Sequence, residues 1–361
     1  MGMRLDAAVR CVAGWVAAAE PTPMVGALLG GVLLSLGLVG GVLLGGAVIG
    51  QTLVVFAVIN LIAALGLSVF SSNSGIMSFG HSAFIGLGAY IWALLTMDRT
   101  AKTELLPTVP AWIADVHVAL LPSIPLTMVA VGVLAAIVGL PLMRLPEFAV
   151  AIASFGVLMI TLTVLDSAIS ITNGAAAFYG VPADIGEGRV VLLAVIALVG
   201  ARLFRDTRVG LALRASRGDD AAARASGVRV PRDRLIAWTL SAMLASLAGV
   251  AYAGYLTVFS PSAFDFDATF VLIAMLVVGG RSSTTGAVVG AIALTAVTQI
   301  GQGLQDVLGS VFHVGLVGLA QIAGAAMLLL VLIFRSDGIA GSHEIDERLI
   351  GWARRKASRD T

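Results

Sequence analysis

The stretch RLFRDTRVGLALRASRGDDAAARASGVRVPRDR, residues 202–234, is the only long polar interval in an otherwise apolar chain. It holds nine arginines and four aspartates, which gives it a net charge of +5. Short arginine-rich loops between membrane spans stay on the cytoplasmic side of the membrane. We therefore expect this loop to be cytoplasmic and to set the orientation of every other segment.

A short helix is predicted inside this loop. Asp219 or Asp220 can supply the capping carboxylate, and residues 221–225 are strong helix formers. Gly227 allows a left-handed end, and Pro231 prevents continuation. In one interpretation the loop serves only orientation and contact with lipid phosphates, but those roles do not require a helix with signals at both ends. A helix parallel to the membrane that docks another protein is the alternative.

The composition is typical of a polytopic membrane protein. Of the 361 residues, 58% are hydrophobic and 12% are charged, and the mean hydropathy is +1.00. Soluble domains average about 25% charged residues. The net charge of +1 provides no general attraction for nucleic acid. The single cysteine, Cys11, excludes an internal disulfide, and the four scattered histidines do not predict a metal site.

Ten apolar segments approach the length of about 20 residues that a helix needs to cross a bilayer. They cover residues 25–49, 52–71, 76–97, 123–143, 147–166, 189–204, 235–257, 268–280, 286–303 and 311–334. An even number of spans places both termini in the cytoplasm with the arginine-rich loop, and the other loop charges agree. A re-entrant half-helix near Arg281 would give a similar pattern.

The chain thus divides into three parts. Residues 1–22 form an amphipathic segment that is expected to lie on the cytoplasmic leaflet. Residues 23–335 form the membrane domain, and residues 336–361 form a cytoplasmic tail.

Two intervals on the opposite side of the membrane are long enough to be structured. Residues 99–122 are rich in proline and are expected to be extended or partly helical. Residues 171–189 carry turn signals at Asn173-Gly174 and at Gly180. Both intervals face the compartment from which a solute would arrive.

The most unusual apolar segment is NSGIMSFGHSAFIGLGAY, residues 73–90. In one interpretation it is an interrupted helix whose freed backbone groups, with Ser78 and His81, line a solute route. In the other, Ser78, Ser82 and Gly86 form a packing face of small residues and His81 bonds to a neighbouring helix. Small residues at four-residue spacing are common in membrane helices, so the residues alone favour packing.

The sequence also restricts the source of energy. The only lysines are Lys102 and Lys356, and neither follows the glycines of a phosphate-binding loop. The spans contain no chain of carboxylates or histidines that would relay protons. Energy for transport is therefore expected to come from outside this chain.

Three blocks resemble the permease subunits of branched-chain amino acid ABC importers of the LivM type. Residues 74–90 are similar to the family's run GxxSLGHAAFFGIGAY. Residues 210–227 are similar to GRALRAIRENEIAAEALG, the family's ATPase-docking loop. Residues 241–290 keep the family's order of small residues, with Ser260-Pro261, Val278-Gly-Gly280, Gly286 and Gly290. The resemblance covers most of the chain, from about Asn60 to Phe334.

This resemblance implies an all-α importer domain of about ten helices in the bacterial cytoplasmic membrane. The implied partners are a second permease subunit of the LivH type, two cytoplasmic ATPases that bind ATP and Mg²⁺, and an extracytoplasmic solute-binding protein. No cofactor is implied for this chain itself. The implied ATPase-coupling residues are Arg214, Arg217, Asp219, Asp220, Ala222, Ala223 and Gly227. The residues implied for the translocation pathway are Asn73, Ser78, Gly80, His81, Phe84 and Tyr90.

Two positions of the docking loop depart from the family's pattern. Asp220 replaces a longer acid, and Arg224 replaces an acid, so the matching groove of the ATPase should differ in charge. Similar permeases also move urea, amides and aromatic acids, which leaves the solute open. The alternative function is a self-contained secondary transporter or channel, which would favour a repeat of the His81 segment; the sequence has no convincing repeat of it.

Overall fold

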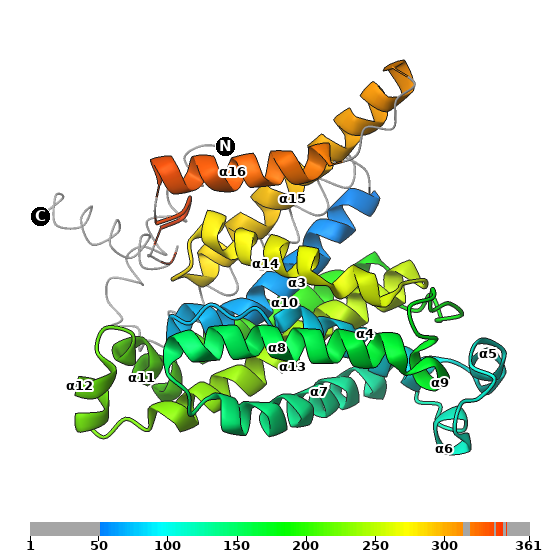
Figure 1. The fold of residues 1–361 in the computed structure, drawn as a ribbon, viewed down its shortest axis with the longest axis horizontal. Coiled ribbons are helices and arrows are strands. Elements are labelled where there is room, and N and C mark those ends of the chain that lie inside the picture. The colour runs from blue at the N-terminus through cyan, green and yellow to red at the C-terminus, as the bar shows by residue number, and fades with distance from the viewer. Residues whose placement is uncertain (1–50, 313–317, 336, 342–343, 345–361) are drawn as a thin grey trace, which may run out of the picture.

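The computed structural model describes residues 51–312, 318–335, 337–341 and 344, and most of these residues are helical (Figure 1). Within them, one isolated antiparallel bridge joins Phe178 and Phe259. The predicted N-terminal segment and the first predicted span, residues 25–49, lie outside the described residues.

Nine longer helices form the body of the part of the chain that the structure describes. They are α3 (Gln51–Ser74), α4 (His81–Thr96), α7 (Leu120–Leu142), α8 (Glu147–Ser167), α10 (Glu187–Arg205), α13 (Val230–Leu256), α14 (Phe266–Gly279), α15 (Thr284–Phe312) and α16 (Leu319–Phe334). Each overlaps one of the nine predicted spans that follow the first. The short helices are α5 (Arg99–Leu105), α6 (Ala111–Ala114), α9 (Ile169–Thr172), α11 (Arg208–Ser216), α12 (Asp220–Ala225) and the 3₁₀ turn η1 (Pro261–Phe264).

Among the described residues, six helical segments are long and apolar enough to cross a membrane. They are Leu53–Ser74, Leu120–Leu142, Glu147–Ser167, Val230–Leu256, Pro261–Gly279 and Thr284–Leu308. The apolar helices α4 and α16 are shorter. The chain is therefore an all-α polytopic membrane protein, as predicted.

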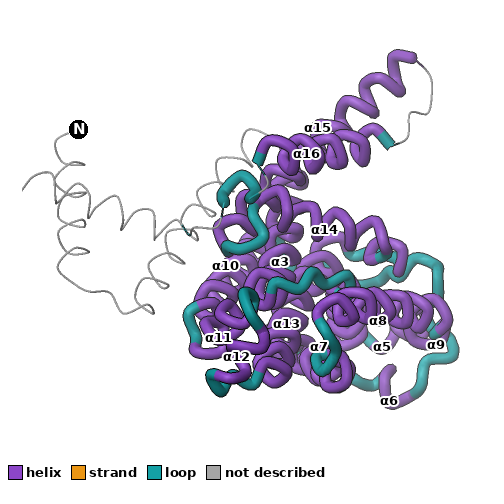
Figure 2. Tube along the Cα trace, turned by 60° about the vertical axis from the view of Figure 1, so that its left-hand side comes forward, coloured by secondary structure: helices purple, strands orange, loops and turns teal. Residues whose placement is uncertain are grey.

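Two predicted boundaries were wrong. The span predicted from residue 76 begins as a helix only at His81, because Gly75 takes a left-handed conformation with φ +80° and interrupts the helix. The span predicted from residue 311 begins at Leu319. Residues 304–310, expected as a loop, are instead helical, and α15 continues to Phe312, since residues 304–312 contain no proline that would end the helix. The C-terminal part of α15 projects beyond the other helices in both views (Figures 1 and 2).

Helix α13 lies at the centre of the bundle and packs against α3, α4 and α7. Small residues allow these helices to approach closely. A Cβ added to Gly66 of α3 would lie 2.7 Å from the backbone nitrogen of Ala245, and one added to Gly249 would overlap the carbonyl oxygen of Ile85. The indole nitrogen of the buried Trp238 donates to the carbonyl oxygen of Ala135, which ties α13 to α7.

The two ends of the bundle differ in character. Helices α11 and α12 lie at one end, and α5, α6 and α9 lie at the opposite end (Figure 1). Residues 99–122 are partly helical, as predicted. Within them, the buried ammonium group of Lys102 donates to the carbonyl oxygens of Ile113 and Val116, which joins the start of this interval to its later part. The predicted turn at Asn173 is confirmed, with a left-handed φ of 63°.

Helices α14 and α15 form a pair whose backbones touch. A Cβ added to Gly290 of α15 would overlap the carbonyl oxygen of Met275, and one added to Gly279 would overlap that of Gly286. Because backbone atoms cannot rotate away, any side chain at these positions would force the helices apart.

We predict that Gly290→Ala lowers the free energy of unfolding by about 3 kcal/mol, near the upper range for an overpacked core. Thermal denaturation of the purified chain in detergent measures this change. The control is Gly303→Ala on the same helix, where a Cβ meets nothing within 4 Å. Alanine has the higher helix propensity, so this control should keep or raise the melting temperature. Equal melting temperatures for the two variants would contradict the close packing.

Candidate functional site

The arginine-rich interval contains two short helices rather than one. Thr207 caps α11, since its hydroxyl oxygen accepts from the backbone nitrogen of Gly210 at 3.1 Å. Helix α12 is the predicted one. Its N-cap is Asp219, whose carboxylate accepts from the backbone nitrogens of Ala221 at 2.9 Å and Ala222 at 3.0 Å. Gly227 follows its end with φ +88°. The predicted caps of α12 are thus both present, whereas α11 was missed although Thr207 could have signalled it.

The seven residues predicted for coupling do not all face outward. The guanidinium group of Arg217 donates to the carbonyl oxygen of Ser72 at 2.9 Å, which ties the segment to the end of α3. Arg214 lies 3.7 Å from the carboxylate of Asp206. Asp220 pairs with Arg224 at 2.7 Å, and Ala223 is buried. The exposed residues of α12 and its two ends are mostly small: Gly218, Asp219, Ala221, Ala222, Arg224, Ala225, Ser226 and Gly227.

Residues 75–80 interrupt the helical path between α3 and α4. Serine hydroxyls satisfy the backbone groups that the interruption frees: Ser154 accepts from Phe79 at 3.0 Å, and Ser78 accepts from Gly80 at 3.3 Å. A Cβ at Gly80 would lie 2.6 Å from the carbonyl oxygen of Ser154. Non-helical backbone is tolerated at membrane depth only where such partners exist. Contacts with Ser154 of α8 therefore hold this non-helical segment in place.

His81 begins α4 and is fully buried. Its Nε2 lies 2.5 Å from the Ser241 hydroxyl, which donates to the carbonyl oxygen of Gly66, so Nε2 carries the proton. Its Nδ1 then accepts from the Ser78 hydroxyl at 2.7 Å. The ring packs against Phe70, Phe84 and Trp238. These contacts agree with the packing interpretation of the His81 segment.

The remaining residues predicted for the pathway are also buried. The amide nitrogen of Asn73 donates to the carbonyl oxygen of Val69 at 2.9 Å. The ring of Tyr90 packs edge-on against Phe178 and Phe259, beneath the bridge at the opposite end of the bundle. The structure thus brings Ser78, Gly80, His81 and Phe84 together and leaves Asn73 and Tyr90 apart.

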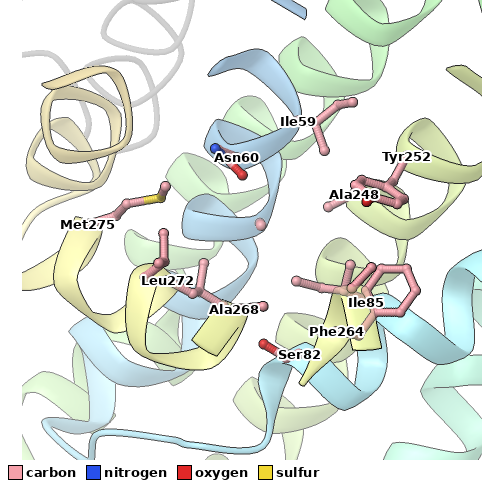
Figure 3. Close-up of a pocket in the computed structure, with 13 residues that line it drawn as sticks. Ile59, Asn60, Ser82, Ile85, Ala248, Tyr252, Phe264, Ala268, Leu272 and Met275 are labelled. Carbon is pink, nitrogen blue, oxygen red and sulfur yellow. The ribbon is translucent and has the colours of Figure 1, made fainter. Parts of the chain in front are cut away.

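A cavity of about 240 Å³ lies beside this segment. Figure 3 shows its lining, with Ser82 and Ile85 from α4, Ile59 and Asn60 from α3, Ala248 and Tyr252 from α13, Phe264 from η1, and Ala268, Leu272 and Met275 from α14. None of the thirteen described residues that line it is charged. The Ser82 hydroxyl is buried without a hydrogen-bond partner, and it is a polar group that could receive a ligand. Sequence reasoning missed this cavity, which five separate segments form.

Within the described ranges, no group of three or more His, Cys, Asp or Glu side chains is placed to hold a metal ion. The two regions with functional character are therefore the α11–α12 segment and the break with its adjoining cavity.

Several curated proteins are similar to the chain. The LivM permease proteins of the high-affinity branched-chain amino acid transport systems of Salmonella typhimurium strain LT2 and Escherichia coli K12 are each 28% identical over 271 residues, 65% of this chain. The match spans 60% of the length of each LivM protein. The LsrC permease of the autoinducer 2 import system of Enterobacter sp. strain 638 is 29% identical over 68% of this chain and 76% of its own length.

A shorter match is found with sugar permeases. The ribose import permease RbsC of Escherichia coli K12 is 29% identical over 32% of this chain and 38% of its own length. No solved structure gives a significant match. The family model described as "Branched-chain amino acid transport system / permease component" matches residues 48–335. This match covers most of the chain and all the helices of the bundle, so the chain belongs to that family of permease components.

Proposed function

We propose that the chain is the membrane-spanning subunit of an ATP-driven ABC importer for branched-chain amino acids or a related small polar solute, such as urea, an amide or an aromatic acid. The observation that carries the proposal is α12, a capped helix at one end of the bundle with an open face of small residues. Such a face suits docking into a groove of another protein. The family match and the similarity to the LivM permease proteins also support a role as a permease subunit.

The proposed assembly contains this chain, a second permease subunit of the LivH type, two cytoplasmic ATP-binding subunits and an extracytoplasmic solute-binding protein. It lies in the bacterial inner membrane. Both termini of this chain are on the cytoplasmic side, since the arginines of the α11–α12 segment favour that side. ATP and Mg²⁺ are bound by the partners, and this chain needs no cofactor of its own.

The α11–α12 segment is joined closely to three long helices, α3, α10 and α13. Helix α11 starts three residues after the end of α10, and Gly210 packs against the carbonyl oxygen of Arg205. Arg217 holds the end of α3, and α13 begins at Val230, five residues after the end of α12. ATP binding by the partners would therefore move α3, α10 and α13 with the segment. The permease would act as a two-state element whose balance the ATPases set.

The cavity lining suits the aliphatic side chain of a solute better than the hydroxyl-covered surface of a sugar. A sugar needs many polar partners when it leaves water, because each unpaired hydroxyl is costly to bury. The lining offers few polar groups, chiefly Asn60, Ser82 and Tyr252. We therefore place the solute route beside the cavity, with Ser82 and Ile85 facing it. Ser78, Gly80, His81 and Phe84 would hold the break that orients α4, and Asn73 and Tyr90 would flank the route.

The docking surface can be tested with a charge that leaves the caps intact. Lysine at Asp219 would remove the N-cap of α12 as well as any contact with a partner, so a better variant is Ala222→Glu on the open face. We expect it to lower uptake at least about tenfold and to abolish recovery of the ATPases, because a charge buried in an interface without a partner costs several kcal/mol.

The matched control is Ala111→Glu, at an exposed helical position at the opposite end of the bundle. It should retain the ATPases and normal uptake. Affinity purification of each tagged variant, followed by solute uptake, provides both readouts. Recovery of the ATPases with Ala222→Glu would contradict docking at α12.

The cavity can be tested by filling it. Ala268→Phe should raise the KM for leucine by about tenfold or block uptake, because the ring would occupy space next to Ser82. Ala325→Phe, at an exposed position of the apolar helix α16, is the control and should leave uptake unchanged. The measurement is the concentration dependence of labelled leucine uptake at matched membrane abundance. An unchanged KM for Ala268→Phe would exclude the cavity from the route.

A further inference from the structure

The chain returns to the bundle after α16. The backbone nitrogen of Ile339 donates to the carbonyl oxygen of Val278 at 2.9 Å, and that of Ala340 donates to Gly279 at 2.9 Å. The hydroxyl of Ser283 donates to the carbonyl oxygen of Gly341 at 3.1 Å. Residues 337–341, together with Glu344, thus form a strap across the turn between α14 and α15. From the sequence alone, these residues are expected only to form part of a cytoplasmic tail.

Glu344 caps α15 from the strap. Its carboxylate accepts from the backbone nitrogens of Thr284 at 2.7 Å and Thr285 at 3.1 Å, and from the Thr285 hydroxyl at 2.7 Å. Carboxylates stabilise helix N-termini by accepting from free backbone nitrogens and by interacting with the helix dipole. This cap comes from a residue 60 positions away in the sequence.

The same carboxylate contacts the last turn of α10. The Nε atom of Arg205 lies 3.0 Å from it, and Nη1 of Arg202 lies 3.7 Å away. Arg205 also donates to the carbonyl oxygen of Ser282 at 2.7 Å. The Glu344 side chain is fully buried, and burial alone would raise its pKa. Arg205, Thr285, Arg202 and Thr284 outweigh burial and hold the pKa below its usual value, so the group stays ionised at neutral pH.

These contacts connect two parts of the proposed machinery. Arg205 ends α10, and three residues later α11 begins the docking segment, which consists of α11 and α12. The strap and Glu344 hold the end of α14 and the start of α15, and α14 supplies Ala268, Leu272 and Met275 to the cavity wall. A buried charge that loses its partner is strongly destabilised. The end of α10 and the α14–α15 turn should therefore move together.

We propose that Glu344 is a positioning residue that transmits movement of the docking segment, through Arg205, to α14 and the wall of the solute cavity. This inference rests on the proposed function, since the movement comes from docked ATPases. Residues 337–341 and Glu344 thus take part in the transport cycle.

The contact itself is tested on the purified full-length chain in detergent. We expect Glu344→Ala to speed amide hydrogen exchange at residues 284–285 by about tenfold, because the two nitrogens lose their charged acceptor. Asp337→Asn is the matched control, as it changes an exposed acid on the same strap. It should leave that exchange unchanged. Unchanged exchange in Glu344→Ala would overturn the inference.

The transmission role is tested in the complete complex reconstituted in liposomes. Glu344→Gln keeps the size of the side chain but removes its charge, and the ratio of solute imported to ATP hydrolysed should fall at least about fivefold while the ATPases remain bound. Glu344→Asp should restore part of that ratio because it restores the charge. A merely structural residue would alter stability or abundance but not this ratio.

The two proposals fail in different ways. If the wild-type chain recovers no ATPase, the proposed function is wrong, and the transmission role falls with it. If the wild-type complex assembles and Glu344→Gln keeps the normal ratio of import to hydrolysis, the role of Glu344 is wrong and the proposed function stands.

Discussion

Close contact between helix backbones is the constraint on which this structure depends. Helices in a bilayer gain little from burying apolar surface against one another, so they associate through packing and hydrogen bonds. Gly66 and Gly249 let α13 reach α3 and α4, and Gly279 and Gly290 let α14 reach α15. The first set holds the centre of the bundle and the second holds the wall of the cavity. The close backbone contact at Gly279 and Gly290 also holds the α14–α15 turn to which the strap is hydrogen-bonded.

Polar groups inside the bundle need hydrogen-bond partners, and this need is the second constraint. Such bonds hold the non-helical residues 75–80 between α3 and α4. The freed nitrogens of Phe79 and Gly80 find serine hydroxyls, and the two nitrogens of His81 bond to Ser78 and Ser241. Arg217 ties the α11–α12 segment to the same region by donating to the carbonyl oxygen of Ser72. A movement of that segment would therefore reach the break directly, without a long chain of side chains between them.

Local signals in the sequence predicted most of the long helices and the short helix α12. Apolar length predicted the spans, and capping residues predicted α12 with both ends, because each signal acts within a few residues. The sequence could not predict contacts between distant residues. Glu344 is a polar residue in an apparent tail, and only folding brings it to Arg205 and Thr285. The cavity has the same origin, since α3, α4, α13, η1 and α14 each supply part of it. His81 was conspicuous in the sequence, but its burial among aromatic rings depends on α3 and α13.

The central claim is that this permease component works within an ATP-driven complex. The most direct measurement is affinity purification of the tagged wild-type chain from its native membrane in mild detergent, followed by identification of the proteins that co-purify. The account predicts recovery of ATP-binding subunits and a second permease, with solute import in liposomes only when ATP is supplied. Recovery of the chain alone, still able to move solute without ATP, would contradict the account and favour a self-contained transporter or channel.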